Sequence, residues 1–592
     1  MSEYESPSPK SFIPLDSPIS VLSPGNIVSI GIQLARLHFG DYFNRSFLAH
    51  LWLGLGLVGS VLLLGLGLAF GFGLDALLST QSFFVVAGVG VGGVLAIAII
   101  LYAVGWMTAT GGIMTRMGVN TLRHRYEPGE LYKQTIQRRI WAYAIAVMLF
   151  SVSLLLTYGL ILAVAALAVV VILPSWEGFY GAATPQLQGT LALGAVIAGL
   201  LLFLGLGMTG YYLAARLWFF DAVLVLEPER SPLEALLRSW ELTQGKGWSV
   251  TTVMFATSLL TLPLSVIASL VNVVVPFVSF LIGVLFFPLW QAVKAANYYD
   301  LAAAKSGLIF DLGTPPPNPR QWLRRVAIQT PEGIALDFAL AGPGSRALAW
   351  MIDQVILYLL LTALVFIGAL IYGYVLFPFL TDQFPDSATD DLNLWAGAIA
   401  TLIGFVVANG YFIYCETFRR GQTPGKQISH IRVVRDDGQP IGVREATLRS
   451  FVGWIDLGFF VIGLMLIMLN RSEKRLGDFA AGTLVIQDEQ IAKQQQTLAI
   501  PTRFSRLTED TVEVLTQQTD PTLLSVNQYL TVRNFLGCRD QLSARDRAQV
   551  TQRLAQQLRS FLMPTSPELL GTIPDESLIE AVYLVNRSAY SI

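Results

Sequence analysis

Long runs of apolar, uncharged residues recur along this chain, and they constrain its fold more than any other feature. Runs of about eighteen such residues are typical of membrane-spanning helices, because a helix in lipid satisfies its own backbone hydrogen bonds. Of the 592 residues, 53% are hydrophobic and 14% are charged, and the mean hydropathy is +0.56. This composition is too apolar for a water-soluble domain. We therefore predict an all-α polytopic membrane protein embedded in a lipid bilayer.

The apolar runs predict about eight transmembrane helices. They cover approximately residues 48–72, 83–108, 141–173, 188–212, 248–271, 273–293, 347–376 and 394–415. Gly88 and Gly92 lie four residues apart in the second span, a spacing that lets helix backbones approach closely in lipid. The run 451–470 has basic clusters at both ends, so it either re-enters the membrane, which we favour, or crosses it as a ninth helix.

Composition and loop charge divide the chain into five parts. These are an N-terminal cytoplasmic segment 1–47, a six-span module 48–310, a Pro-rich linker 311–320, a second membrane domain 321–488 and a helical soluble tail 489–592. The connections 109–140, 213–247 and 294–346 carry most of the basic residues between spans. Because basic loops stay in the cytoplasm, we expect these connections, the N-terminus and the tail to be cytoplasmic.

Short β-hairpins are expected outside the spans. Residues 326–340 alternate apolar residues around a Pro-Glu-Gly turn, and residues 428–434 are followed by an Asp-Asp-Gly turn. Both segments are predicted to form small cytoplasmic hairpins, and residues 482–486 could add another strand. In the tail, residues 542–561 have the apolar spacing of an amphipathic helix.

An arginine and an aspartate lie seven residues apart at the start of two apolar runs, Arg346 with Asp353 and Arg449 with Asp456. Seven residues make about two helical turns, so each pair shares one helix face, about 10 Å apart along the axis. Every other span can be drawn without an ionisable side chain in its interior. An acid inside the membrane is a candidate functional group, so we expect these four residues to form one polar site.

Two interpretations of this polar site remain open. Two carboxylates close together in a low dielectric do not both ionise easily, so one could hold a proton and exchange it for a small cation. This interpretation predicts a proton/cation exchanger or a small-solute transporter. Alternatively, each arginine neutralises one aspartate as a structural clamp. The protein would then be a non-catalytic membrane organiser that recruits cytoplasmic proteins through its hairpins and residues 489–592.

The sequence offers little material for other chemistry. The four histidines are scattered and the two cysteines lie far apart, so no metal site, cofactor or disulfide framework is expected. The segment Thr423-Pro424-Gly425-Lys426 lacks the spacing of a phosphate loop, and it is interpreted as a turn with Lys426 at the lipid headgroups. Glu416 is interpreted as a solvated interfacial charge. Neither enzyme activity nor a nucleic-acid partner is expected.

Several motifs in residues 321–488 occur in the order and spacing of one known family. Besides the two Arg/Asp pairs, they include Gly421, Thr423, Pro424, Gly425, Lys426, Arg432, Arg475, Gly477 and Asp478. This part of the chain resembles the RDD family of bacterial membrane proteins. The resemblance implies that Arg346 and Asp353 are signature residues, and that Asp456 or Asp478 is the second signature acid. It also implies a location in a bacterial plasma (inner) membrane, and some members are linked to sodium/proton antiport.

The six-span half has a shorter resemblance of its own. Residues 231–240, Ser-Pro-Leu-Glu-Ala-Leu-Leu-Arg-Ser-Trp, are similar to a segment of the membrane modules found beside bacterial glycerophosphodiester phosphodiesterases. No phosphodiesterase metal site is visible in the sequence, so this resemblance implies no activity.

Overall fold

The computed structural model describes most of the chain and divides it into two compact units. The described residues are 22–78, 83–123, 133–181, 205–273, 278–305, 322–329, 335–376, 386–458, 472–488, 524–542, 544–562 and 573–590, with a few single positions between them. One unit comprises Ile27–Tyr299, and the other comprises Met1–Asn26 together with Asp300–Ile592. We call them the first unit and the second unit and describe each by itself.

Eight helices among the described residues are long and apolar enough to cross a membrane. They contain the spans Phe39–Phe72, Val85–Leu122, Arg139–Ala163, Gly205–Leu226, Gly247–Asn272, Val278–Ala302, Pro343–Leu376 and Leu394–Phe418. Shorter helices and two small β-sheets form the other regular structure in the described part. The prediction of an all-α polytopic membrane protein is thus confirmed. Whether residues 451–470 re-enter or cross lies outside the described residues, and so does the linker 311–320.

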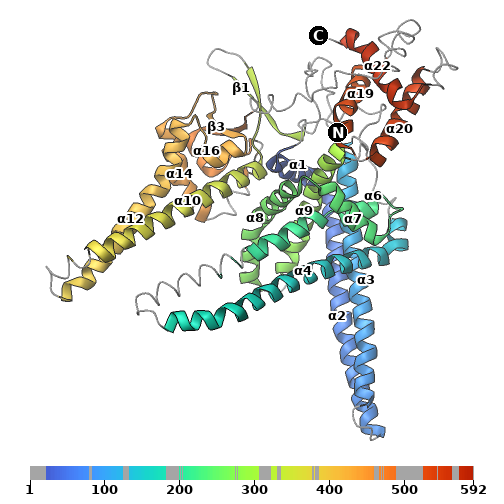
Figure 1. Ribbon diagram of the computed structural model, residues 1–592, viewed down its shortest axis with the longest axis horizontal. Helices are drawn as coiled ribbons and strands as arrows, with labels where there is room; N and C mark the ends of the chain where they lie inside the picture. Colours follow the sequence, from blue (N-terminus) through green and yellow to red (C-terminus); the bar gives the residue numbers. More distant parts are fainter. Residues whose placement is uncertain are drawn as a thin grey trace. The chain divides into compact units, whose positions relative to one another are not determined.

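The first unit is helical throughout its described part (Figure 1). Its helices are α2 (Phe39–Leu78), α3 (Phe83–Leu122), α4 (Lys133–Gly181), α6 (Phe220–Leu226), α7 (Pro232–Thr243), α8 (Gly247–Asn272) and α9 (Val278–Lys305). Helix α1 (Pro24–Leu37) also lies almost wholly in this unit. The expected N-terminal segment 1–47 is therefore helical from Pro24 onward.

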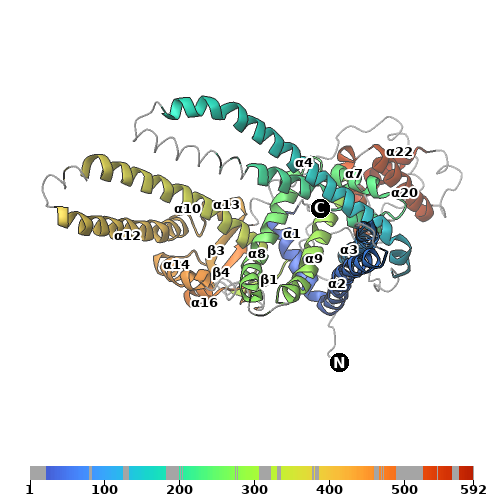
Figure 2. The ribbon, with the colours of Figure 1, turned by 90° about the horizontal axis from the view of Figure 1, so that it is seen from below.

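Helices α2 and α3 run side by side as a long pair in Figure 1, and they remain neighbours in Figure 2, which looks nearly along their axes. Small residues allow this close approach. A Cβ atom added to Gly88 would lie 2.2 Å from the carbonyl oxygen of Gly67, and one added to Gly92 would lie 3.0 Å from that of Leu63. The predicted packing role of Gly88 and Gly92 is thus confirmed, because a larger side chain would push the two backbones apart.

Helix α7 begins with a capping box. The Ser231 hydroxyl accepts a hydrogen bond from the backbone N–H of Glu234, and the Glu234 carboxylate accepts one from the N–H of Ser231. Pro232 stands at the first helical position, where its missing N–H costs nothing. The segment 231–240 is therefore a well-capped helix, and its resemblance to the phosphodiesterase-associated modules stays a prediction.

A buried ion pair in the first unit corrects the expectation that Asp353 and Asp456 are the only charges inside the spans. Lys294 Nζ lies 2.8 Å from Asp221 Oδ2, and the two side chains are 6% and 4% exposed. Both residues lie within candidate spans of the structure. The sequence-based spans 188–212 and 273–293 stopped before them, because runs chosen to avoid charges end where the first charge occurs.

In the second unit, two antiparallel strand pairs adjoin the membrane helices. Strand β1 (Arg325–Gln329) pairs with β2 (Ala335–Ala339), which confirms the first predicted hairpin. The second predicted hairpin is reduced to one antiparallel bridge between Val434 and Pro440. Along its length β3 (Ile431–Arg435) pairs with the distant β4 (Thr483–Gln487). The proposed extra strand at 482–486 is thus the true partner of β3. Ala341 N donates to Val485 O at 2.9 Å, which joins the end of the first hairpin to β4.

The helices of the second unit's membrane domain are α10 (Pro343–Ile371), α12 (Asp386–Phe418), α13 (Pro424–Ile428), α14 (Val443–Gly458) and α16 (Leu476–Ala481). Helices α10 and α12 lie side by side as a hairpin in both views (Figures 1 and 2). A buried apolar cluster that includes Ala349, Ile431, Val433, Ala446 and Val485 joins α10 and α14 to the strands β3 and β4. The sheet is therefore packed against the ends of the membrane helices.

The tail contains three helices with a core of their own. They are α19 (Val526–Cys538), α20 (Ala544–Leu562) and α22 (Asp575–Tyr590). Val532, Phe535, Leu554, Leu558 and Leu578 are fully or almost fully buried in this core. The predicted helical tail is confirmed, and the amphipathic stretch 542–561 corresponds to α20.

Candidate functional site

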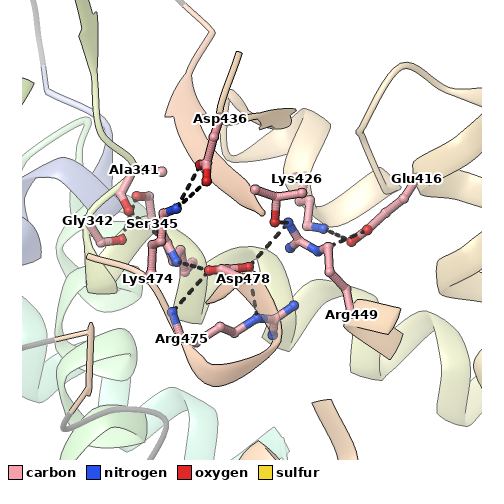
Figure 3. A network of polar contacts seen from close by, with 12 residues as sticks. Ala341, Gly342, Ser345, Glu416, Lys426, Asp436, Arg449, Lys474, Arg475 and Asp478 are labelled. Carbon is pink, nitrogen blue, oxygen red and sulfur yellow. Dashed lines mark hydrogen bonds and ion pairs between the residues drawn. The ribbon is translucent and has the colours of Figure 1, made fainter. Parts of the chain in front are cut away.

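Asp478 is the centre of a buried network of charges in the second unit (Figure 3). Its carboxylate lies 2.8 Å from Arg346 Nη1, 3.2 Å from Arg449 Nη1 and 3.5 Å from Arg475 Nε. It also accepts a hydrogen bond from the backbone N–H of Arg475 at the start of α16. Asp478 itself is fully buried. One carboxylate therefore ties α16 to α10 and α14.

The arginines keep Asp478 ionised. Burial alone would raise the pKa of this carboxyl group, but the guanidiniums of Arg449, Arg475 and Arg346 outweigh it and hold the pKa well below its usual range. Since each arginine also comes from a different part of the chain, the interaction fixes tertiary structure. Asp478 is thus a permanent negative charge and is unsuited to exchanging a proton.

Arg449 links Asp478 to a second acid. Its Nε lies 3.3 Å from Glu416 Oε2, and its Nη1 donates to Thr483 Oγ1 at 3.0 Å. The other oxygen of Glu416 forms an ion pair with Lys426, whose pKa is lowered by burial although Glu416 opposes that shift. We name these interacting side chains the charge cluster: Arg346, Glu416, Lys426, Arg449, Arg475 and Asp478. Figure 3 labels all of them except Arg346.

Asp353 stands apart from the charge cluster. Its Oδ1 accepts hydrogen bonds from Tyr411 Oη at 2.9 Å and from the backbone N–H of Gly425 at 2.8 Å. Its Oδ2 accepts one from Thr423 Oγ1 at 2.5 Å. The side chain is 1% exposed and forms no ion pair with any residue that the structure describes. Asp353 is thus a buried carboxylate held by neutral donors.

The turn that holds Asp353 depends on two glycines. Gly421 has a φ of +81°, and it ends α12 by donating its N–H to Glu416 O at 2.8 Å. A Cβ atom added to Gly425 would lie 2.1 Å from the carbonyl oxygen of Ala349. Thr423 caps the short helix α13, and Pro424 follows at its first position. The Gly-x-Thr-Pro-Gly-Lys motif therefore shapes a tight turn around a carboxylate from α10.

Substitution of Gly425 should open this turn. We expect Gly425→Ala to lower the free energy of unfolding by about 1–3 kcal/mol, because the new methyl group overlaps the backbone of α10. Gly410→Ala on α12 is the matched control, since no atom lies within 4 Å of a Cβ at that position; it should be neutral or slightly stabilising. Thermal unfolding of the two purified variants would test this. Equal stability would contradict the close approach.

A cavity of about 250 Å³ adjoins the charge cluster. It lies between α10, α12 and α14, and Glu416, Arg449 and Arg475 form its charged wall. Neutral polar and aromatic side chains complete it, among them Trp350, Gln354, Tyr358, Asn409, Phe412 and Ser450. Asp353 is not among the residues that line it. The cavity thus combines fixed charge, hydrogen-bonding groups and apolar surface, as small-molecule sites do.

The predicted site residues make different side-chain contacts in the structure from those expected from the sequence. Arg346 and Arg449 both contact Asp478, so neither neutralises Asp353. The arginines do neutralise an aspartate, as the structural-clamp interpretation expected, but that aspartate is Asp478. Asp456 lies on α14, and its side chain is outside the described ones. Of the remaining motif residues, Arg432 pairs with Asp488 at 2.5 Å, and Gly477 lies buried at the start of α16.

Glu416 and Lys426 are a second correction. Glu416 is 3% exposed and Lys426 has a 12% exposed side chain, so Glu416 is not a solvated charge and Lys426 does not extend to the headgroups. The two side chains form a buried ion pair. The sequence interpretation considered only the basic residues next to Glu416 in the chain, so it could not reveal this contact. Tyr411, Asn409 and Ser450 were also missed, although the polar residue Asn409 inside an apolar run was a usable signal.

These features define a class of protein: a polytopic α-helical membrane protein in which a small β-sheet and a buried charge cluster pack against the ends of two membrane helices. Residues 340–482 match the model of the RDD family. This part of the second unit is therefore an RDD family domain, as the motifs indicated. Comparisons with curated proteins and with solved structures gave no match.

Proposed function

We propose that the second unit is a transport domain that binds a small solute bearing an anionic group. The observation that carries this proposal is the cavity of about 250 Å³ with Arg449, Arg475 and Glu416 in its wall. In transporters, charged and polar residues between membrane helices generally mark the solute pathway, because they are costly to keep there otherwise. The RDD family match supports a membrane role without specifying a solute.

The balance of charge favours an anion over the small cation considered from the sequence. The charge cluster contains four basic and two acidic side chains. The side chain of Arg475 is 30% exposed and lines the cavity, so an anionic solute could contact this cationic group. Arg449 and Arg475 belong to both the cluster and the cavity wall, and the planar guanidinium group is suited to carboxylates and phosphates.

Asp353 is the group that we assign to proton exchange. It is buried and has no cationic partner among the residues that the structure describes, and two of its three donors, Tyr411 and Thr423, are hydroxyl groups. A hydroxyl can rotate to accept a hydrogen bond instead of donating one. Asp353 can therefore gain or lose a proton while both contacts are kept. Such a group would let an anionic solute move together with a proton.

Flux measurements in reconstituted vesicles would test this proposal, with inorganic phosphate and succinate as probe anions and an internal pH-sensitive dye. We expect anion-dependent proton entry that Asp353→Asn abolishes, and that Asp456→Asn also abolishes if its side chain joins the site. Arg475→Gln should raise the half-saturating anion concentration by about tenfold, the value of one charge-assisted hydrogen bond.

Arg444→Gln is the matched control for Arg475→Gln, because Arg444 is exposed on α14 and does not line the cavity. Proton entry that is independent of the anion, or an Asp353→Asn protein that inserts and keeps full flux, would rule the proposal out.

A membrane organiser is the second candidate function. The observation that favours it is the tail, whose helices α19, α20 and α22 pack around their own core. A separately packed module is suited to binding a cytoplasmic protein. If the vesicles show no movement of either probe anion, and deletion of 489–592 removes the cellular function while the membrane part stays stable, the organiser role would be the better account.

A further inference from the structure

A second cavity, of about 360 Å³, lies in the first unit between α2, α8 and α9. The residues that matter for its chemistry are His50, Thr261, Ser265, Ser269, Phe287 and Trp290. All six lie within candidate membrane spans. A histidine inside a membrane span is a candidate functional group, and here it shares one cavity with three hydroxyl groups.

The hydroxyl groups of α8 offer only lone pairs to this cavity. Thr261, Ser265 and Ser269 follow one another at one-turn intervals along the helix. Each uses its single proton on the backbone carbonyl four residues earlier, at distances of 3.1, 2.9 and 2.8 Å. A hydroxyl that donates to its own helix retains its acceptor lone pairs. This wall therefore accepts hydrogen bonds from a ligand and donates none.

The imidazole of His50 adds another acceptor. Its Nδ1 lies 2.8 Å from the backbone carbonyl oxygen of Ser46, and because a carbonyl can only accept, Nδ1 carries the proton. In the neutral ring Nε2 is then a bare lone pair. This nitrogen faces Gly283 in the cavity wall and has no hydrogen-bond partner among the described residues.

Aromatic rings form the other part of the wall. His50 is flanked by Phe280 and Phe287, with ring centroids 5.9 and 5.5 Å away in edge-to-face arrangements. Phe286 and Trp290 also line the cavity. The faces of such rings attract cations. Acceptor atoms and aromatic faces together are complementary to an ammonium group, which presents N–H donors and a diffuse positive charge.

Helix α9 beside the cavity contains an internal proline. Pro288 has no N–H, so the carbonyl of Val284 lacks its regular partner within α9. Ser46 Oγ on α2 donates to this carbonyl at 2.7 Å instead. Helix α8 also contains an internal proline, Pro263, although both helices continue through their prolines. Prolines within neighbouring spans are one indication of a binding site in membrane transporters.

We propose that this cavity is a binding site for a small ammonium-type cation, with His50 as its proton-sensitive acceptor. Of the described residues that line it, His50 alone is ionisable. The contacts of His50 with α2 and α9 involve Ser46, Phe280 and Phe287, which carry no charge. Protonation of Nε2 would turn the acceptor into a charged donor and repel the ligand. A proton and the ammonium group therefore compete for the site.

The test uses the full-length protein in phosphatidylcholine nanodiscs, with methylammonium chloride as the probe and sodium chloride as the salt control. Bound ligand raises the thermal unfolding temperature in a saturable way. We expect such a rise near pH 8, where the imidazole of His50 is neutral, and its loss at a pH low enough to protonate the ring. His50→Gln should raise the half-saturating concentration by about tenfold and remove its pH dependence.

Ser265→Ala is a second variant that keeps the test decisive if His50→Gln fails to fold, and it should also weaken the response. Its matched control is Ser153→Ala, because Ser153 on α4 makes the same kind of hydroxyl-to-carbonyl contact but does not line this cavity. The proposal is overturned by the absence of a saturable shift, by an equal shift with sodium chloride, or by half-saturation that neither variant changes.

Discussion

Asp478→Asn should destabilise the second unit by about 3–5 kcal/mol, the usual effect of removing one partner from a buried ion pair. The substitution keeps the size of the side chain but removes the charge that Arg346, Arg449 and Arg475 share. Three guanidiniums would then face one another around a neutral amide. Since these arginines belong to α10, α14 and the start of α16, we expect the packing of all three elements to loosen.

Thermal or denaturant unfolding of the purified protein would measure this loss. Asp437→Asn is the control, because Asp437 forms an exposed pair with Arg435 at 3.3 Å, with side chains 36% and 43% exposed. Exposed pairs contribute about 0–1 kcal/mol. Losses of similar size in the two variants would show that the charge cluster contributes no more than an ordinary surface pair.

The same ion pairs imply a defined dependence on pH. The pKa of Asp478 is depressed in the folded protein, so its contribution is fully present above the unfolded value of about 3.9 and is lost as the pH falls further. Stability from this group should therefore be constant across neutral pH and decline only in strong acid. In Asp478→Asn this acid-dependent part of the stability curve should disappear.

Hydropathy predicted the membrane helices well, because a span in lipid is specified by local composition alone. Seven of the eight predicted spans have a counterpart among the described helices, although the ends differ, and most of the predicted span 188–212 lies outside the described residues. The ends were less predictable because helices such as α2 (Phe39–Leu78) continue beyond the apolar run. Charges at such ends, like Lys294, become buried through tertiary contacts that a hydropathy window does not contain.

Strand pairing was only half predictable. A Pro-Glu-Gly turn between two short strands is local information, and β1 and β2 form the expected hairpin. The Asp-Asp-Gly turn after β3 looked similar, and Gly438 does adopt a φ of +81° there. However, the chain continues into α14 instead of returning as a strand, so β3 pairs with β4. Two segments so far apart in sequence give no local signal of their pairing.

The sequence indicated several residues of the charge cluster but not which side chains contact one another. Spacing singled out Arg346, Asp353 and Arg449, since acids and bases at the entry to apolar runs are rare and costly, and the structure places all three in buried polar contacts. It paired them within each helix, because helical periodicity reports only intrahelical neighbours. The resemblance to the RDD family offered Asp478 as an alternative to Asp456, and Asp478 is the acid that both arginines contact.

Arg449→Met is expected to have an effect comparable to that of Asp478→Asn, about 3 kcal/mol or more. Arg449 is 2% exposed, and its guanidinium contacts both Glu416 and Asp478. Methionine retains much of the apolar stem but leaves each acid with one cation fewer. Arg449→Lys should recover only part of the loss, because a single ammonium group cannot reach two carboxylates as a planar fork does.

A double-mutant cycle of Arg449→Met with Glu416→Gln would measure how much the contact between Arg449 and Glu416 contributes to the free energy of unfolding. If Arg449 joins the two acids, the double variant should lose less stability than the two single losses added, with a coupling of about 1 kcal/mol or more. Arg444→Gln, an exposed position on the same helix, should change stability by less than about 0.5 kcal/mol. Strictly additive losses would mean that Arg449 stabilises the fold through Asp478 alone. The two acids would then be separate sites, and the cavity wall would be less rigid than the contacts imply.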